Sequence, residues 1–272
     1  MSANILASVI RYIPEFIAIG TLVALLFAEA SFKENAKGRY LVQLLAVIGL
    51  LICLIALALN LDEPGATIFT NALVIDPFST FIKIIMVTGT IGTIYLSFLS
   101  EDIYGNLKSE FCIMSIGVLI GGMLLASANN MLTMYLGVET LSVLSYVLAT
   151  MKKRDDRSAE AGLKYVLYGG LTSGIMLFGI SHIFGTLGTI QFVELASKLA
   201  HVDSFQIAIL SVSFILFFAG IGYKIACAPF HMWAPDVYEG APIPVTTFFA
   251  IVPKMAGMAA LARISLTIFS GE

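Results

Sequence analysis

The feature that most constrains this chain is a series of apolar runs, each about 18 residues or longer. Helical runs of that length cross about 30 Å of hydrocarbon. Hydrophobic residues make up 58% of the 272 residues and charged residues 12%, a balance that a soluble domain of this size cannot keep off its surface. Because a bilayer offers no partners to backbone polar groups, an open sheet is excluded. The sequence therefore predicts an all-α, polytopic transmembrane helical bundle that is surrounded by lipid.

We expect about eight spans, with a short amphipathic helix at 191–200 that lies on the membrane interface between the sixth and seventh spans. The spans are predicted near residues 5–28, 40–60, 74–99, 111–128, 131–151, 160–184, 205–230 and 243–269.

Basic residues gather in the connections that follow spans one, three and five. They are Lys33, Lys37, Arg39, Lys108, Lys152, Lys153, Arg154 and Arg157, whereas the other connections contain only Lys198. Cytoplasmic loops carry the excess of Lys and Arg. This distribution predicts an N-terminus on the outer side of the membrane, which would be the inner (cytoplasmic) membrane if the source is bacterial.

The region of the seventh span, residues 205–240, is too long for one plain crossing. Pro229 and Pro235 follow the pair Gly220 and Gly222, and prolines of this kind interrupt a helix. Broken helices at membrane depth are tolerated where they line a cavity or an ion site. The pattern predicts a discontinuous seventh helix, with its break near 220–240.

Three charged residues are predicted deep in the membrane: Glu139 midway along span five, Lys224 at the break, and Lys254 midway along span eight. An isolated charge there costs roughly 2.5–3.5 kcal/mol on insertion scales, so it usually faces a partner or water and marks a pathway. Lys164, one or two turns inside span six, is either a fourth pathway residue or a lysine that snorkels to the surface.

The pair Glu139 and Lys224 suggests proton exchange. A carboxylate and an ammonium about 4 Å apart gain roughly 4 kcal/mol at an effective dielectric near 20, which is comparable with the cost of desolvation. A lysine that is charged when paired and neutral when its partner turns away can accept a proton and release it. His231, just after the break, could relay protons near neutral pH, or it could cap or pack.

Other polar residues in the spans have simpler interpretations. Lys83 is expected to snorkel to the outer surface, and Glu15 and Glu29, near the ends of the first span, are expected to be interfacial. The three cysteines lack the spacing of metal sites or disulfide frameworks and are expected to be packing residues; they are Cys53, Cys112 and Cys227. The net charge of −3, without a basic stripe, argues against nucleic acid as a partner.

Four motifs resemble the antiporter-like membrane subunits of respiratory complex I, and within them the subunit N branch of NADH-quinone oxidoreductase. The longest is the segment 223–257, YKIACAPFHMWAPDVYEGAPIPVTTFFAIVPKMAG. The others are YIPEF in the first span, GVETLSVLSYVLA in the fifth and GLKYVLYGG in the sixth.

This resemblance implies a membrane subunit that couples quinone reduction by NADH to proton translocation. The motifs assign proton transfer to Glu139, Lys164, Lys224 and Lys254. NAD, FMN, iron-sulfur clusters and quinone would be bound by other subunits, so no cofactor or metal is expected in this chain. Its partners would be the other membrane subunits of complex I and the bilayer.

The family generally has fourteen helices, arranged as two inverted five-helix repeats. The resemblance divides this chain into residues 1–110, the three N-terminal helices, and residues 111–272, the first antiporter-like repeat. The second repeat and the lysine of the twelfth helix have no counterpart among the 272 residues. Two alternatives stay open: a subunit of a multi-component monovalent cation/proton antiporter, and a non-pumping structural half of the complex.

Overall fold

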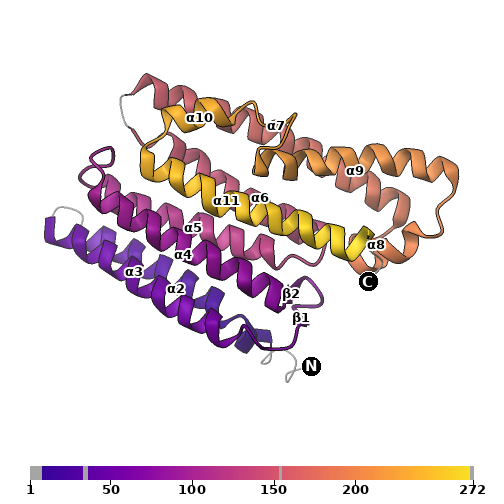
Figure 1. Ribbon diagram of the computed structural model, residues 1–272, viewed down its shortest axis with the longest axis horizontal. Helices are drawn as coiled ribbons and strands as arrows, with labels where there is room; N and C mark the ends of the chain where they lie inside the picture. The colour runs from indigo at the N-terminus through magenta and orange to yellow at the C-terminus, as the bar shows by residue number, and fades with distance from the viewer. Residues whose placement is uncertain (1–7, 33–35, 153–154, 270–272) are drawn as a thin grey trace.

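The computed structural model describes residues 8–32, 36–152 and 155–269, and it consists almost entirely of long antiparallel helices (Figure 1). Eight helices in the described residues are long and apolar enough to cross a membrane, which confirms the predicted spans and identifies an integral membrane protein. The helices are α2 (Ile13–Phe32), α3 (Ala36–Leu59), α4 (Pro77–Leu99), α5 (Leu107–Ala126), α6 (Met131–Ala149), α7 (Asp156–Leu187), α9 (Ser204–Ile225) and α11 (Ile243–Ile264), which η1 (Ser265–Phe269) continues.

Some predicted features fall in the parts of the chain without a described position. Residues 5–7 of the first predicted span lie outside the described residues, as do Lys33, Lys153 and Arg154 of the basic connections. In the described part, the first spanning helix begins at Ile13.

Three short elements occupy one end of the bundle. Strand β1 (Ala66–Ile68) pairs antiparallel with β2 (Leu73–Ile75), and helix α8 (Phe192–Leu199) buries Phe192 and Leu195. Isolated bridges join Leu73 to Ala128 and Asn130 to Gln191, so these connections are tied to one another. Figure 1 places them at the same end as both termini of the chain. The short amphipathic helix that the sequence predicts at 191–200 is present.

Side-chain caps fix where several spans begin. Asp76 accepts a hydrogen bond from the Ser79 amide at the start of α4, and Asn130 accepts one from Thr133 at the start of α6. Such residues satisfy amide groups that have no partner in the first turn of a helix. The caps therefore fix the residues at which these two spans begin.

The predicted break in the seventh span is present. Helix α9 ends at Ile225; its C-cap residue Ala226 has a left-handed backbone (φ 55°), and the Cys227 amide donates to Gly222 O at 3.0 Å. Residues 227–233 form no regular helix, and α10 (Ala234–Gly240) then leads to α11. Pro229 lies in the linker between the helices, and Pro235 lies in the first turn of α10, where a missing amide hydrogen costs little.

Two pairs of helices approach through their backbones. A Cβ atom on Gly121 of α5 would lie 2.5 Å from the Leu141 amide nitrogen of α6, and one on Gly179 of α7 would lie 2.6 Å from Ser213 O of α9. Only glycine permits such contacts, which bring helix axes close together. Helix α5 is the most enclosed span, with 72% of its apolar window buried.

Candidate functional site

Lys224 lies in the last turn of α9 and is 2% exposed. Its Nζ atom has no hydrogen-bond partner among the described residues, but three tyrosine rings surround it: those of Tyr146 on α6, Tyr165 on α7, and Tyr223. The distances from Nζ to the ring centroids are 5.6, 5.6 and 5.2 Å. The faces of aromatic rings attract cations at such distances. The buried ammonium is thus held by ring faces rather than by a carboxylate.

The segment after the break closes this aromatic cluster. The Trp233 ring stacks on Tyr165 with centroids 4.6 Å apart, and its Nε1 donates to Tyr223 O at 3.0 Å. The Tyr223 hydroxyl donates to Tyr165 O at 2.8 Å. Sequence reasoning missed these residues, although Tyr165 and Tyr223 are each adjacent to a lysine that it singled out and Trp233 is the only tryptophan of the chain.

Glu139 on α6 is half-buried and faces α7, where it accepts a hydrogen bond from the Ser173 hydroxyl. The Tyr135 hydroxyl lies 3.4 Å from the same Ser173 oxygen. Glu139 and Lys224 interact electrostatically, but no ion pair within 4 Å joins them among the ion pairs of the described residues. The structure therefore places the predicted pair in one region as two separated charges.

Lys254 lies on α11 and is half-buried. Its Nζ atom is 5.2 Å from the centroid of the Tyr238 ring, and Tyr238 contacts Trp233 edge to face at 6.1 Å. The Tyr238 hydroxyl is buried and finds no hydrogen-bond partner among the residues with a described position. Aromatic side chains of the linker and of α10 thus connect the surroundings of Lys224 with those of Lys254.

Lys164 is separate from this cluster. Its side chain is 36% exposed and pairs with Asp236 of α10 at 2.5 Å and with Glu160 at 2.7 Å. The three residues line an open pocket of about 220 Å³. The position of Lys164 agrees better with a lysine that reaches the surface than with one deep in the membrane.

Several residues of the break face outward in this chain. His231 and Pro229 are exposed, as is Pro235 in the first turn of α10. Cys227 is exposed as well, so the expectation of a packing residue was wrong at this position, because the cysteine follows the end of α9 and lies in the linker. Cys53 and Cys112 are buried, as expected.

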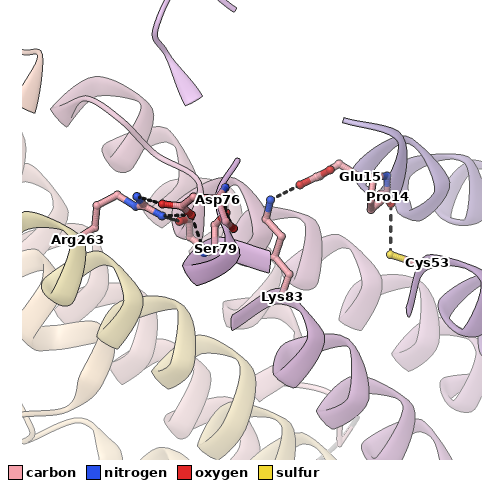
Figure 2. A network of polar contacts seen from close by, with 8 residues as sticks. Pro14, Glu15, Cys53, Asp76, Ser79, Lys83 and Arg263 are labelled. Carbon is pink, nitrogen blue, oxygen red and sulfur yellow. Dashed lines mark hydrogen bonds and ion pairs between the residues drawn. The ribbon is translucent and has the colours of Figure 1, made fainter. Parts of the chain in front are cut away.

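The interpretations of Lys83 and Glu15 were wrong. Lys83 on α4 is 1% exposed and forms an ion pair with Glu15 of α2, which is 2% exposed (Figure 2). The Cys53 thiol donates to Pro14 O beside them at 3.3 Å. Lys83 lies on the buried face of α4, so its ammonium reaches a carboxylate rather than the surface.

The expectation for Glu29 was also wrong. Both of its carboxylate oxygens are buried, without a hydrogen-bond partner within residues 8–32, 36–152 and 155–269, so this group does not face solvent at the interface. The reason is its position on α2, where it faces the interior and interacts electrostatically with Cys112 of α5.

A second ion pair joins the start of α4 to the last turns of α11. Arg263 donates to both carboxylate oxygens of Asp76, at 2.9 and 3.0 Å, and to Ala126 O at 3.2 Å (Figure 2). Burial raises the pKa of Asp76, but the Arg263 guanidinium and the hydrogen bonds from Ser79 lower it more, so this pKa lies below its usual value. No local sequence pattern predicts a pair of residues 187 positions apart.

No group of three or more metal-ligating side chains is suitably placed for a metal ion among the residues that the structure describes. Whether cofactors bind in this chain stays a prediction. The site as observed offers a buried ammonium, a carboxylate on the neighbouring helix and aromatic hydroxyls, which are groups that hold protons.

Comparison with known proteins agrees with this picture. Residues 128–272 match the family described as NADH:quinone oxidoreductase/Mrp antiporter, TM. NADH-quinone oxidoreductase subunit N of Bartonella bacilliformis is 39% identical over 99% of this chain and 54% of its own length. Subunit N of Geobacillus kaustophilus is 38% identical over 94% of this chain and 51% of its own length. The chain spans about half the length of the curated relatives it matches.

Solved structures show the same fold. A chain of respiratory complex I from Thermus thermophilus with bound aureothin is 29% identical, with a TM-score of 0.77 over 92% of this chain and 52% of its own. A chain of the Mrp complex from Dietzia superposes with a TM-score of 0.74 at 21% identity over 95% of this chain and 50% of its own, which shows a shared fold alone. From the match of residues 128–272, the chain belongs to the NADH:quinone oxidoreductase/Mrp antiporter transmembrane family.

Proposed function

We propose that this chain forms the proton-conducting first repeat of a subunit that resembles subunit N. In the assembled complex it would couple quinone reduction by NADH to proton translocation. The observation that carries the proposal is Lys224, an ammonium that is 2% exposed and has no hydrogen-bond partner in the part of the chain that the structure describes. A buried charge without a paired carboxylate is costly, and such residues mark ion and proton pathways in membranes.

The arrangement supports a simple exchange. With Lys224 charged, the Glu139 carboxylate and the tyrosine ring faces stabilise its ammonium. With Lys224 neutral, the amine fits an apolar aromatic environment at a lower cost than the ammonium, because desolvation disfavours the charged form more strongly. Movement of the Glu139 carboxylate toward or away from Lys224 would therefore make the lysine take up or release a proton. Lys254, beyond Trp233 and Tyr238, is the next group that could accept it.

Other parts of the assembly follow from the same proposal. NAD, FMN, iron-sulfur clusters and quinone would be held by partner subunits, and the N-terminus would lie on the outer side of the cytoplasmic membrane. Residues 1–110 would form the accessory three-helix unit and residues 111–272 the conducting repeat. Lys164 and His231 would act near the surface, where protons enter or leave, because both are at least partly exposed.

The test is the substitution Lys224→Met in the assembled complex, reconstituted into proteoliposomes. We expect quinone-dependent acidification of the vesicle lumen to fall, with the subunit still present in the purified complex. Lys198→Met is the matched control, because Lys198 is a lysine of α8 that bonds only to Leu187 O in the described residues. An unchanged ratio of protons to electrons in Lys224→Met would overturn the proposal. A pH change driven by a sodium gradient would instead indicate cation/proton antiport.

A further inference from the structure

Helix α10 lies beside the N-terminal part of α7 (Figure 1). Its last residue, Gly240, packs directly against α7, because a Cβ atom there would lie 2.6 Å from Arg157 O and 2.7 Å from the Ala161 Cβ atom. Only glycine permits so close an approach. This contact holds the end of α10 that leads to α11. The other end follows the irregular linker 227–233 and needs a contact of its own.

Lys164 supplies an ionic contact at that other end. Its ammonium pairs with Asp236, in the first turn of α10, at 2.5 Å and with Glu160 of α7 at 2.7 Å. Glu160 is one turn away on the same helix, so Asp236 is the partner through which Lys164 joins the two helices. A further pair, Arg157 with Glu239 at 3.6 Å, is 79% and 75% exposed and therefore contributes little.

The ion pair lies beside the aromatic stack that closes the cluster around Lys224. Lys164 precedes Tyr165 in α7, and Asp236 follows Trp233 by three residues, which is close to one helical turn. Trp233 is 3% exposed and stacks on Tyr165 with ring planes 17° apart. The Tyr165 ring in turn faces the Lys224 ammonium. A contact that holds Asp236 at Lys164 therefore also holds Trp233 over Tyr165.

The same geometry separates two roles for Lys164. A lysine that carries a proton loses its charge in each cycle, and with it the ionic contact between α7 and α10. We propose that Lys164 is a positioning residue: its ammonium stays charged and, through Asp236, keeps Trp233 closed over the Lys224 cluster. The inference rests on the proposed function, in which Lys224 exchanges the proton, and it gives Lys164 a role near the surface without a proton of its own.

Loss of the ion pair should make the linker and α10 open more often. The Lys164 and Asp236 side chains are 36% and 48% exposed, so solvent screens the pair, and its removal should raise the open population about fivefold at most. Amide hydrogen exchange reports this population, because amides of a locally opened segment exchange with solvent. The measurement is hydrogen-exchange mass spectrometry of the assembled complex, on peptides that cover residues 227–240.

Four variants locate the effect. Lys164→Met and Asp236→Asn should each exchange about two- to fivefold faster at residues 227–240, and the double variant should exchange no faster than either single one, because both remove one interaction. Glu160→Gln is the matched control, since it removes the ion pair within α7 and leaves the one to α10. Its exchange at residues 227–240 should be unchanged. Unchanged exchange in Lys164→Met would overturn the proposal.

Lys164→Arg distinguishes a positioning residue from a proton carrier. Arginine keeps the positive charge and cannot be deprotonated in proteins, and the open pocket of about 220 Å³ around Lys164 leaves room for the larger guanidinium. We expect Lys164→Arg to keep the slow exchange of residues 227–240 and, in proteoliposomes, the ratio of protons to electrons of the unmodified complex. Lys164→Met should lower this ratio, but less than Lys224→Met does.

The two readouts separate this inference from the proposed function. Hydrogen exchange at residues 227–240 does not depend on proton transport, whereas the effect of Lys224→Met on pumping does. An unchanged ratio in Lys224→Met would contradict the proposed function. A ratio in Lys164→Arg that falls as far as in Lys224→Met, with slow exchange retained, would instead identify Lys164 as a proton carrier and overturn the positioning role.

Discussion

Two regions of this protein each combine a buried lysine with a glutamate, and the two pairs are arranged differently. Between α2 and α4, Lys83 and Glu15 form a closed ion pair in which both side chains are almost fully buried. Between α6 and α9, Lys224 and Glu139 stay apart, with Glu139 bonded to Ser173 and Lys224 surrounded by tyrosine rings. The same two residue types thus form a contact in one region and an open arrangement in the other.

Under the proposed function, the closed pair stabilises the fold and the open arrangement exchanges protons. In a closed pair each charge compensates the desolvation of the other, so a change of protonation at either residue is strongly opposed. In the open arrangement, the charge on the lysine depends on how near the carboxylate comes. Buried charge alone is therefore a poor indicator of function, and the pairing distance is a better one.

The largest effect on stability is expected for Lys83→Met. The substitution leaves Glu15 as a buried charge without its cation, which should lower the free energy of unfolding by roughly 3–5 kcal/mol. Thermal unfolding in detergent, followed by circular dichroism, measures the change. The double substitution Lys83→Met with Glu15→Gln should recover most of the loss. If the double variant is as unstable as the single one, the ion pair is not the cause.

An intermediate effect is expected for Asp76→Asn, which keeps an acceptor for the cap of α4 but removes the charge that pairs with Arg263. We expect a loss of roughly 1–3 kcal/mol at neutral pH, as for a hydrogen bond to a charged group. The pKa of Asp76 lies below its usual value in the folded protein. Its stabilisation is therefore complete above the unfolded pKa of about 3.9 and is lost as the pH falls through the lower folded pKa.

The pH dependence gives this prediction a sharp readout. The difference in unfolding free energy between the unmodified chain and Asp76→Asn should be constant from pH 8 to about 5 and should narrow below about 4. A difference of the same size at the lowest pH that the folded protein tolerates would contradict the assignment to charge.

The smallest effect on stability is expected for Lys224→Met, the variant with the largest expected effect on transport. The substitution removes an unpaired buried ammonium and fills its place with an apolar side chain. It should lower the free energy of unfolding by no more than about 1 kcal/mol, or it should raise this free energy. The same melting experiment applies. If Lys224→Met lowers the free energy of unfolding as much as Lys83→Met does, the two lysines are structurally equivalent, and the proposed difference between the two regions is wrong.

Much of the fold could be predicted from the sequence, because span length and proline position act locally. The eight spans and the break after Ile225 follow from apolar runs and from Pro229 and Pro235. The predicted start of the third span deviates by a few residues, because the Asp76 cap places the start of α4 at Pro77, whereas α6 begins at Met131 as predicted.

The partners of the charged residues could not be predicted in the same way. Lys83 meets Glu15 over a separation of 68 residues, and Lys164 meets Asp236 over 72. Such pairs depend on which helix faces are packed together, and hydropathy does not encode this. The tyrosines around Lys224 were missed for the same reason, since aromatic residues in a span are consistent with ordinary packing until their neighbours are known.

The backbone contacts at Gly121 and Gly179 have a mechanical consequence. They hold α5 against α6 and α7 against α9, so that each pair of helices forms one rigid unit. Glu139 belongs to the first unit and Lys224 to the second. The interface between the two units is made by side chains, including Glu139 with Ser173 and Tyr146 with Tyr165. A small displacement of one unit along this interface changes the distance between Glu139 and Lys224 and hence the Coulomb energy of the two charges. Under the proposed function, strain applied to one unit would reach Lys224 as a change in its affinity for a proton.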